Sequence, residues 1–133
     1  MNAKEISDPK SFLYKTESYA IRGAIFEVYN ELGAGFLESV YQECLMRELR
    51  LRKIPVVSQP KLEIAYKGKL TGLTFQPDFI CYQSIILELK AVKEFTDEHR
   101  SQTLNYLKAS SFRLAMLVNF CSTPRVTIER FIL

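Results

Sequence analysis

Residues 75–90 read Phe-Gln-Pro-Asp-Phe-Ile-Cys-Tyr-Gln-Ser-Ile-Ile-Leu-Glu-Leu-Lys. Two runs rich in β-forming residues flank the polar dipeptide Gln83-Ser84, and this pattern predicts a β-hairpin. If the chain reverses at Gln83, residues at equal distances from it lie opposite each other. This register gives the following opposed pairs: Gln76 with Lys90, Asp78 with Glu88, and Ile80 with Ile86.

Side chains alternate between the two faces of a strand, so the same register sorts the hairpin into two surfaces. One face is mixed and carries Gln76, Asp78, Ile80, Ile86, Glu88 and Lys90. The other face is apolar and carries Phe75, Phe79, Cys81, Ile85, Leu87 and Leu89. The apolar face must therefore be covered by another part of the protein.

The opposed carboxylates Asp78 and Glu88 are the unusual feature of the mixed face. Their Cβ atoms would lie about 5 Å apart, where two negative charges repel by roughly 3 kcal/mol at an effective dielectric constant near 20. A divalent cation such as Mg²⁺ or Mn²⁺ removes this objection, because Mg²⁺ is bound by one or two carboxylates together with waters and phosphate oxygens. Lys90 points the same way as Glu88, within reach of a metal-bound water or a scissile phosphate.

A plainer interpretation is a solvated sheet face with scattered charges. Two residues of this face, Ile80 and Ile86, are apolar, however. In addition, each carboxylate lies opposite the other carboxylate and not opposite a lysine. Both features favour a partly covered cleft. Pro77 leaves one further alternative open, because a bulge at this proline would shift the pairing by one residue.

The rest of the chain predicts a single α/β domain. Apolar residues recur with helical spacing over residues 21–32 and again over 37–53, with Gly33 suited to the helix end between them. Thr96 is suited to cap a third helix. The predicted strands cover residues 56–66, 70–82, 85–92, 114–120 and 126–133, and the third helix covers 96–109. The predicted order is therefore α-α-β-β-β-α-β-β over residues 13–133, preceded by a flexible arm over 1–12.

Composition narrows the function classes without choosing among them. The 133 residues include 18 Lys and Arg against 15 Asp and Glu, and a net charge of +3 permits a nucleic-acid partner without arguing for one. The single histidine, His99, disfavours a Ser-His-Asp triad and a histidine-rich metal site. Three cysteines far apart in sequence, no signal sequence and no apolar run of about 20 residues predict a cytoplasmic protein without a membrane span.

Taken together, these motifs resemble a known family. Pro77-Asp78, nine intervening residues and then Glu88-Leu89-Lys90 are similar to the signature of the PD-(D/E)XK, or restriction-endonuclease-like, nuclease superfamily. The segment 35–41, Gly-Phe-Leu-Glu-Ser-Val-Tyr, resembles the motif of the GxxExxY proteins, a bacterial and archaeal branch. The resemblance implies a restriction-endonuclease-like αβββαβ core with a mixed central sheet, an extra N-terminal helix and a C-terminal strand.

The resemblance also implies a metal site and its neighbours. Asp78 and Glu88 would bind Mg²⁺ or Mn²⁺, with Glu38 and the Leu89 carbonyl as further ligands. Glu38 is also favourable simply because it lies near a helix N-terminus. Gln102 and Tyr106 match a pair that recurs in RecB-like members, although a polar helix edge explains the same spacing.

The expected function is metal-dependent hydrolysis of phosphodiester bonds in nucleic acid, with DNA as the favoured substrate and Asp78, Glu88 and Lys90 at the centre. One alternative is a catalytically inactive nuclease-fold module that binds nucleic acid or a protein partner. Another is a subunit that needs a second copy or a larger nucleic-acid-processing partner, and residues 126–133 alternate in the way of an edge strand.

Overall fold

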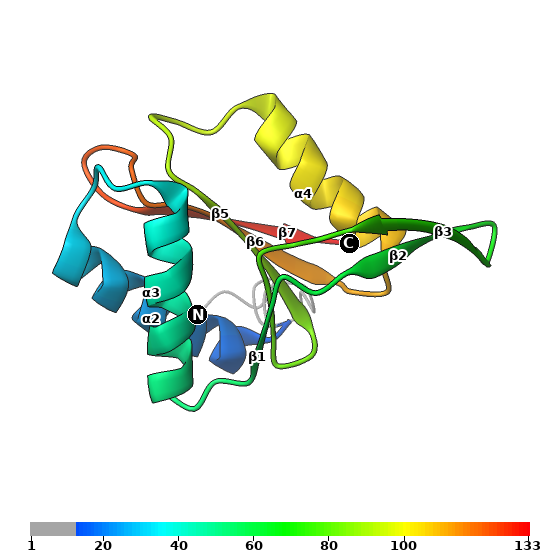
Figure 1. Cartoon of the computed structure of the whole chain (residues 1–133), viewed down its shortest axis with the longest axis horizontal. Coiled ribbons are helices and arrows are strands. Elements are labelled where there is room, and N and C mark those ends of the chain that lie inside the picture. The colour runs from blue at the N-terminus through cyan, green and yellow to red at the C-terminus, as the bar shows by residue number, and fades with distance from the viewer. Residues whose placement is uncertain (1–12) are drawn as a thin grey trace, which may run out of the picture.

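The computed structural model describes residues 13–133, and the flexible arm predicted over residues 1–12 lies outside this range. The chain forms three long helices and seven strands in the described part (Figure 1). The helices are α2 (Lys15–Leu32), α3 (Glu38–Leu51) and α4 (Asp97–Ala109). The strands are β1 (Val56–Ser58), β2 (Leu62–Tyr66), β3 (Lys69–Phe75), β4 (Phe79–Cys81), β5 (Ile85–Lys90), β6 (Leu114–Asn119) and β7 (Thr127–Ile132).

Five strands form the central sheet, in the order β1-β4-β5-β6-β7. All neighbours are antiparallel except β5 and β6, which are parallel and joined through α4. The sheet is therefore mixed, as the sequence predicts, and β7 is one of its edge strands. β2 and β3 form a separate two-stranded sheet, which projects from the rest of the molecule in Figure 1.

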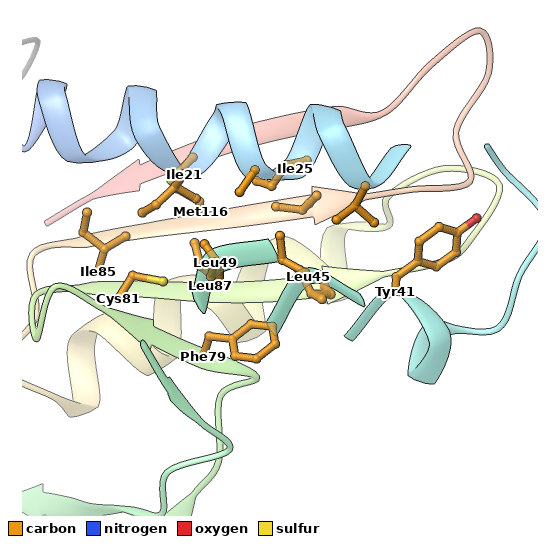
Figure 2. Packing of buried hydrophobic residues seen from close by; sticks show 14 of the residues in the cluster. Ile21, Ile25, Tyr41, Leu45, Leu49, Phe79, Cys81, Ile85, Leu87 and Met116 are labelled. Carbon is orange, nitrogen blue, oxygen red and sulfur yellow. The ribbon is translucent and has the colours of Figure 1, made fainter. Parts of the chain in front are cut away.

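Helices cover both faces of the central sheet. On one face, α2 and α3 bury the larger hydrophobic cluster, which includes Ile21, Ile25, Tyr41, Leu45, Leu49, Phe79, Leu87 and Met116 (Figure 2). On the other face, α4 packs on a smaller cluster made of Ile80, Ile86, Leu107 and Ala115. The apolar hairpin face predicted from the sequence is thus covered by two helices. Within residues 13–133, no helix is long and apolar enough to cross a membrane.

The hairpin register predicted around Gln83 is confirmed over residues 79–87. Phe79 pairs with Leu87, Ile80 with Ile86, and Cys81 with Ile85. Tyr82 and Gln83 both adopt positive φ angles, 55° and 56°, and the Ser84 N–H donates to the Cys81 carbonyl at 3.0 Å. Positive φ at two successive residues matches the twist of a tight hairpin.

The strands predicted over residues 56–66 and 70–82 are each broken in two, which corrects the expected strand count. Gln59 has a φ of 49° and precedes Pro60, so the chain leaves the sheet between β1 and β2. Pro77 has no N–H to continue a ladder, so β3 and β4 are separate strands. The long hairpin becomes a short pair inside the sheet and a projecting pair outside it.

The same break overturns two predicted side-chain positions. Phe75 does not continue the apolar face, because its ring stacks on Tyr106 of α4 with a centroid distance of 4.7 Å. Gln76 does not pair with Lys90, since its Nε2 donates to the Gln59 carbonyl at 2.6 Å. Strand alternation predicts faces only while the strand is continuous, and Pro77 ends that continuity.

The predicted C-terminal ends of the helices agree with the structure to within two residues, whereas α2 begins at Lys15, before the predicted start at residue 21. Gly33 follows α2 with a φ of 67°, and its N–H donates to the Tyr29 carbonyl. Thr96 caps α4: its hydroxyl accepts from the His99 N–H at 3.2 Å, and its own N–H donates to His99 Nδ1 at 3.1 Å. The single histidine therefore serves the helix start.

The substitution Leu87→Ala tests how much the buried β5 side chains contribute to the free energy of unfolding. Leu87 is 0% exposed, so Leu87→Ala should lower the free energy of unfolding by about 2–5 kcal/mol through lost burial and a residual cavity. Leu70→Ala on the projecting hairpin, at 71% exposure, should change it by less than about 0.5 kcal/mol. Urea unfolding of both variants measures the difference, and equal losses would contradict this division of the core.

Candidate active site

Asp78 and Glu88 are held together by bonds that cross between their strands. Asp78 lies one residue before β4, and its backbone N–H donates to Glu88 Oε1 at 2.9 Å. The backbone N–H of Leu89 in β5 donates to Asp78 Oδ2 at 2.7 Å. Each carboxylate is thus fixed by the backbone of the other strand, and the predicted opposition of Asp78 and Glu88 is present in the structure.

Gln42 provides a third support that the sequence analysis missed. It lies on α3, and its Nε2 donates to Asp78 Oδ1 at 3.1 Å. Both oxygens of Asp78 therefore accept a hydrogen bond, one from β5 and one from α3. The signal for Gln42 was its position four residues after Glu38, which places both side chains on one helix face.

Burial raises the pKa of Glu88 to about 8, and the neighbouring charge of Asp78 raises it as well. The Asp78 N–H and Lys90 act in the opposite direction, and Glu38 adds to the increase. Burial also raises the pKa of Asp78, opposed by the Leu89 N–H and by Lys90. Near neutral pH the metal-free site therefore keeps a proton on Glu88.

Glu38 and Lys90 lie close enough to the pair for their charges to affect the pKa values of Asp78 and Glu88. Glu38 is exposed at the first residue of α3, and Lys90 is partly exposed at the end of β5. Leu89 lies between the site residues in sequence, but its side chain is fully buried in the larger cluster. Only its backbone is therefore available to the site.

Tyr106 approaches the pair from α4. Burial raises the pKa of its hydroxyl, and the charges of Glu88 and Asp78 raise it further. The ring stacks on Phe75, and the hydroxyl accepts a hydrogen bond from Gln102 Nε2 at 3.0 Å. The structure brings Tyr106 to the carboxylates, whereas Gln102 is exposed and contacts the site through Tyr106.

The donor set suits a hard divalent cation only in part. Across residues 13–133, no three His, Cys, Asp or Glu side chains lie close enough together to hold a metal ion, so Glu38 does not complete a three-carboxylate group. Mg²⁺ requires only one or two protein carboxylates, since waters and substrate oxygens fill its other positions. The pair of Asp78 and Glu88 meets this requirement, and its raised pKa values show that burial disfavours the charged carboxylates, a cost that a bound cation would offset.

Comparison with known proteins adds two findings. The crystal structure of a protein designated SSO0001 is similar, with a TM-score of 0.56 and 19% sequence identity, over 93% of this chain and 61% of that one. At this identity the similarity concerns the fold alone. No curated protein gave a match to the sequence.

A family model described as the PD-(D/E)XK nuclease superfamily matches residues 15–131, nearly the whole chain. The mixed sheet with helices on both faces agrees with the restriction-endonuclease-like fold of that superfamily. The chain therefore belongs to the PD-(D/E)XK nuclease superfamily.

Proposed function

We propose that this protein is a metal-dependent nuclease of the GxxExxY branch, which hydrolyses phosphodiester bonds of nucleic acid, with DNA as the favoured substrate. The observation that carries the proposal is the pair of buried Glu88 and half-buried Asp78, fixed by backbone N–H groups and next to Lys90. Two neighbouring buried carboxylates destabilise a fold unless something offsets their charge. Membership of a nuclease superfamily supports a cation and a phosphate as the partners.

The proposed ligands of Mg²⁺ or Mn²⁺ are Asp78 and Glu88, with the Leu89 carbonyl as an additional oxygen donor, and Glu38 adds negative charge nearby without completing the group. When bound, a divalent ion would lower the pKa of a bound water and neutralise charge on the phosphate. Lys90 would orient the attacking water or stabilise the charge that develops on the phosphate oxygens. Gln102 and Tyr106 would hold the backbone of the strand, and Gln42 would keep Asp78 in place.

The contacts of the segment 35–41 support its reading as a GxxExxY motif. Gly35 has a φ of 110°, which side chains other than glycine rarely adopt. Tyr41 is fully buried, stacks on Phe120 with a centroid distance of 4.5 Å, and accepts from the Phe36 N–H at 3.3 Å. The glycine and the tyrosine thus fix the turn from which Glu38 begins α3 and carries its charge toward the site.

A catalytically inactive module that binds nucleic acid or a protein is the second candidate. It is favoured by the lack, within the described residues, of a third acid that joins the pair. Activity that requires a second copy or a larger partner belongs to the same group of proposals, and the edge strand β7 offers a surface for such pairing. The free thiols of Cys44, Cys81 and Cys121 support a reducing, cytoplasmic location.

The first test is cleavage. With Mg²⁺ or Mn²⁺ the wild type should cut plasmid or linear DNA, and Asp78→Asn and Lys90→Ala should each lower the rate by about 10²–10³-fold. Arg50→Ala is the matched control, because Arg50 is exposed in the last turn of α3, away from Glu38. RNA and single-stranded DNA, assayed in parallel, identify the substrate. No cleavage by folded wild type, or equal cleavage by Asp78→Asn, would refute the enzymatic proposal.

The second test is metal binding without substrate. Mg²⁺ or Mn²⁺ at about 100 times its Kd should stabilise the folded protein by about 2.7 kcal/mol, seen as a higher melting temperature. Asp78→Asn should abolish the increase, and Gln42→Ala should weaken metal affinity by about 10–100-fold through loss of the Asp78 contact. A metal response that is unchanged in Asp78→Asn would show that the ion binds elsewhere.

The third test uses pH in the absence of metal. Below about pH 4.5 both folded and unfolded chains hold the Glu88 proton, and its contribution to stability is complete. As the pH rises toward about 8, the unfolded chain loses the proton that the folded chain keeps, so the free energy of unfolding falls and the contribution is then lost. Glu88→Gln should flatten this fall, whereas Glu94→Gln, on the exposed loop before α4, should retain it. Denaturant unfolding across this range measures both, and an equal slope in Glu88→Gln would contradict the assignment.

A further inference from the structure

A basic cavity lies between the first turns of α2 and the edge strand β7. It has a volume of about 480 Å³ and is lined by Lys15, Thr16, Ser18, Tyr19, Arg22 and Arg130. None of these residues is acidic. The lining is therefore cationic and rich in hydroxyl groups, in contrast to the acidic pair of the candidate active site.

The cavity is separate from the carboxylate pair. Arg130 of β7 pairs with Met116 of β6, and Met116 pairs with Leu87 of β5. Met116 and Leu87 lie in the cluster under α2 and α3, and Figure 2 shows α2 passing over the strand that carries Met116. Arg130 therefore points to the α2 face, whereas Glu88, next to Leu87 in the strand, points to the α4 face.

Arg22 and Arg130 both line this cavity, and none of the described residues that line it with them is acidic. Burial lowers the pKa of Arg130, and the charge of Arg22 lowers it further. Arg130 Nη2 donates to the Leu13 carbonyl at 2.8 Å, which is a neutral acceptor. Within residues 13–133, neither arginine has an acidic partner. This is an excess of positive charge that an anion would offset.

Two buried donors at the same place have no acceptor among residues 13–133. Ser18 is only 5% exposed, and its Oγ has no hydrogen-bond partner among the described residues; Arg130 Nε is also buried without one. Buried polar groups are normally hydrogen-bonded, so these two atoms indicate a missing acceptor. Oxyanions accept only, and the planar guanidinium matches phosphate oxygens well.

We propose that this cavity binds the phosphate of a nucleotide, with Arg22 and Arg130 on the phosphate oxygens and the Ser18 hydroxyl turned toward them. The volume falls within the range of about 300–1,000 Å³ that is typical of small-molecule sites. Tyr19 lines the cavity and is 78% exposed, so its ring offers a surface on which a base can stack. The nucleotide is either free or the phosphorylated end of a strand, and the inference does not rest on the proposed nuclease activity.

The test is calorimetric titration of the full chain without divalent metal. Adenosine 5′-monophosphate should bind, adenosine should not, and inorganic phosphate should bind more weakly because it lacks a base. Arg22→Gln and Arg130→Gln should each weaken binding by about tenfold or more, as expected for hydrogen bonds to charged groups. Arg50→Gln should leave it unchanged. Arg22 lies on a partly exposed helix position, so its variant keeps the test valid if Arg130→Gln unfolds.

Oligonucleotides with and without a 5′-phosphate distinguish the two sources. Tighter binding of the phosphorylated strand than of the free nucleotide assigns the strand end, and the reverse assigns the free nucleotide. Equal affinity for inorganic phosphate and the nucleotide would overturn the nucleotide assignment. No phosphate binding, or binding that Arg22→Gln and Arg130→Gln leave intact, would overturn the site. Because Asp78→Asn should bind equally well, failure here is separable from failure of the nuclease proposal.

Discussion

The interaction on which this structure depends is the reciprocal bonding between Asp78 and the β5 strand. β4 has only three residues, and the backbone ladder cannot continue past Pro77. Beyond that point the ladder is replaced by side-chain bonds, from the Asp78 N–H to Glu88 and from the Leu89 N–H to Asp78. The contacts that extend the sheet are therefore the same contacts that orient the two carboxylates. A substitution that removes them affects both the sheet edge and the orientation of the carboxylates.

The sequence was sufficient for the parts of the fold that local rules control. Equal spacing around Gln83 predicted the register of β4 and β5, and Asp78 and Glu88 lie together next to this ladder, as that spacing predicted. It failed at Phe75, because alternation assumes a continuous strand, and at Gln42, whose partner is 36 residues away and comes from a packed helix. Tertiary packing decides such contacts; the sequence shows only that Gln42 shares a helix face with Glu38 and does not show that this face meets Asp78.

The two faces of the sheet carry opposite electrostatic environments. On the α4 side, burial raises the pKa values of both Asp78 and Glu88, and the charge of Asp78 raises that of Glu88 further. On the α2 side, burial and a neighbouring Arg22 lower the pKa of Arg130. A net charge of +3 conceals this division, since both environments are local and nearly cancel in the sum. Partners are therefore indicated by where charges are buried, and total charge is a poor guide.

The projecting β2–β3 hairpin has a thermodynamic consequence for the site. A two-stranded sheet is marginally stable by itself, so this one relies on the apolar residues at its base. Leu62 packs against the cluster under α4, and Phe75 stacks on Tyr106. Motion of the hairpin and freedom of Tyr106 are thus coupled through one ring contact. Any molecule that orders the hairpin also reduces the conformational entropy that Tyr106 must lose when it engages a ligand.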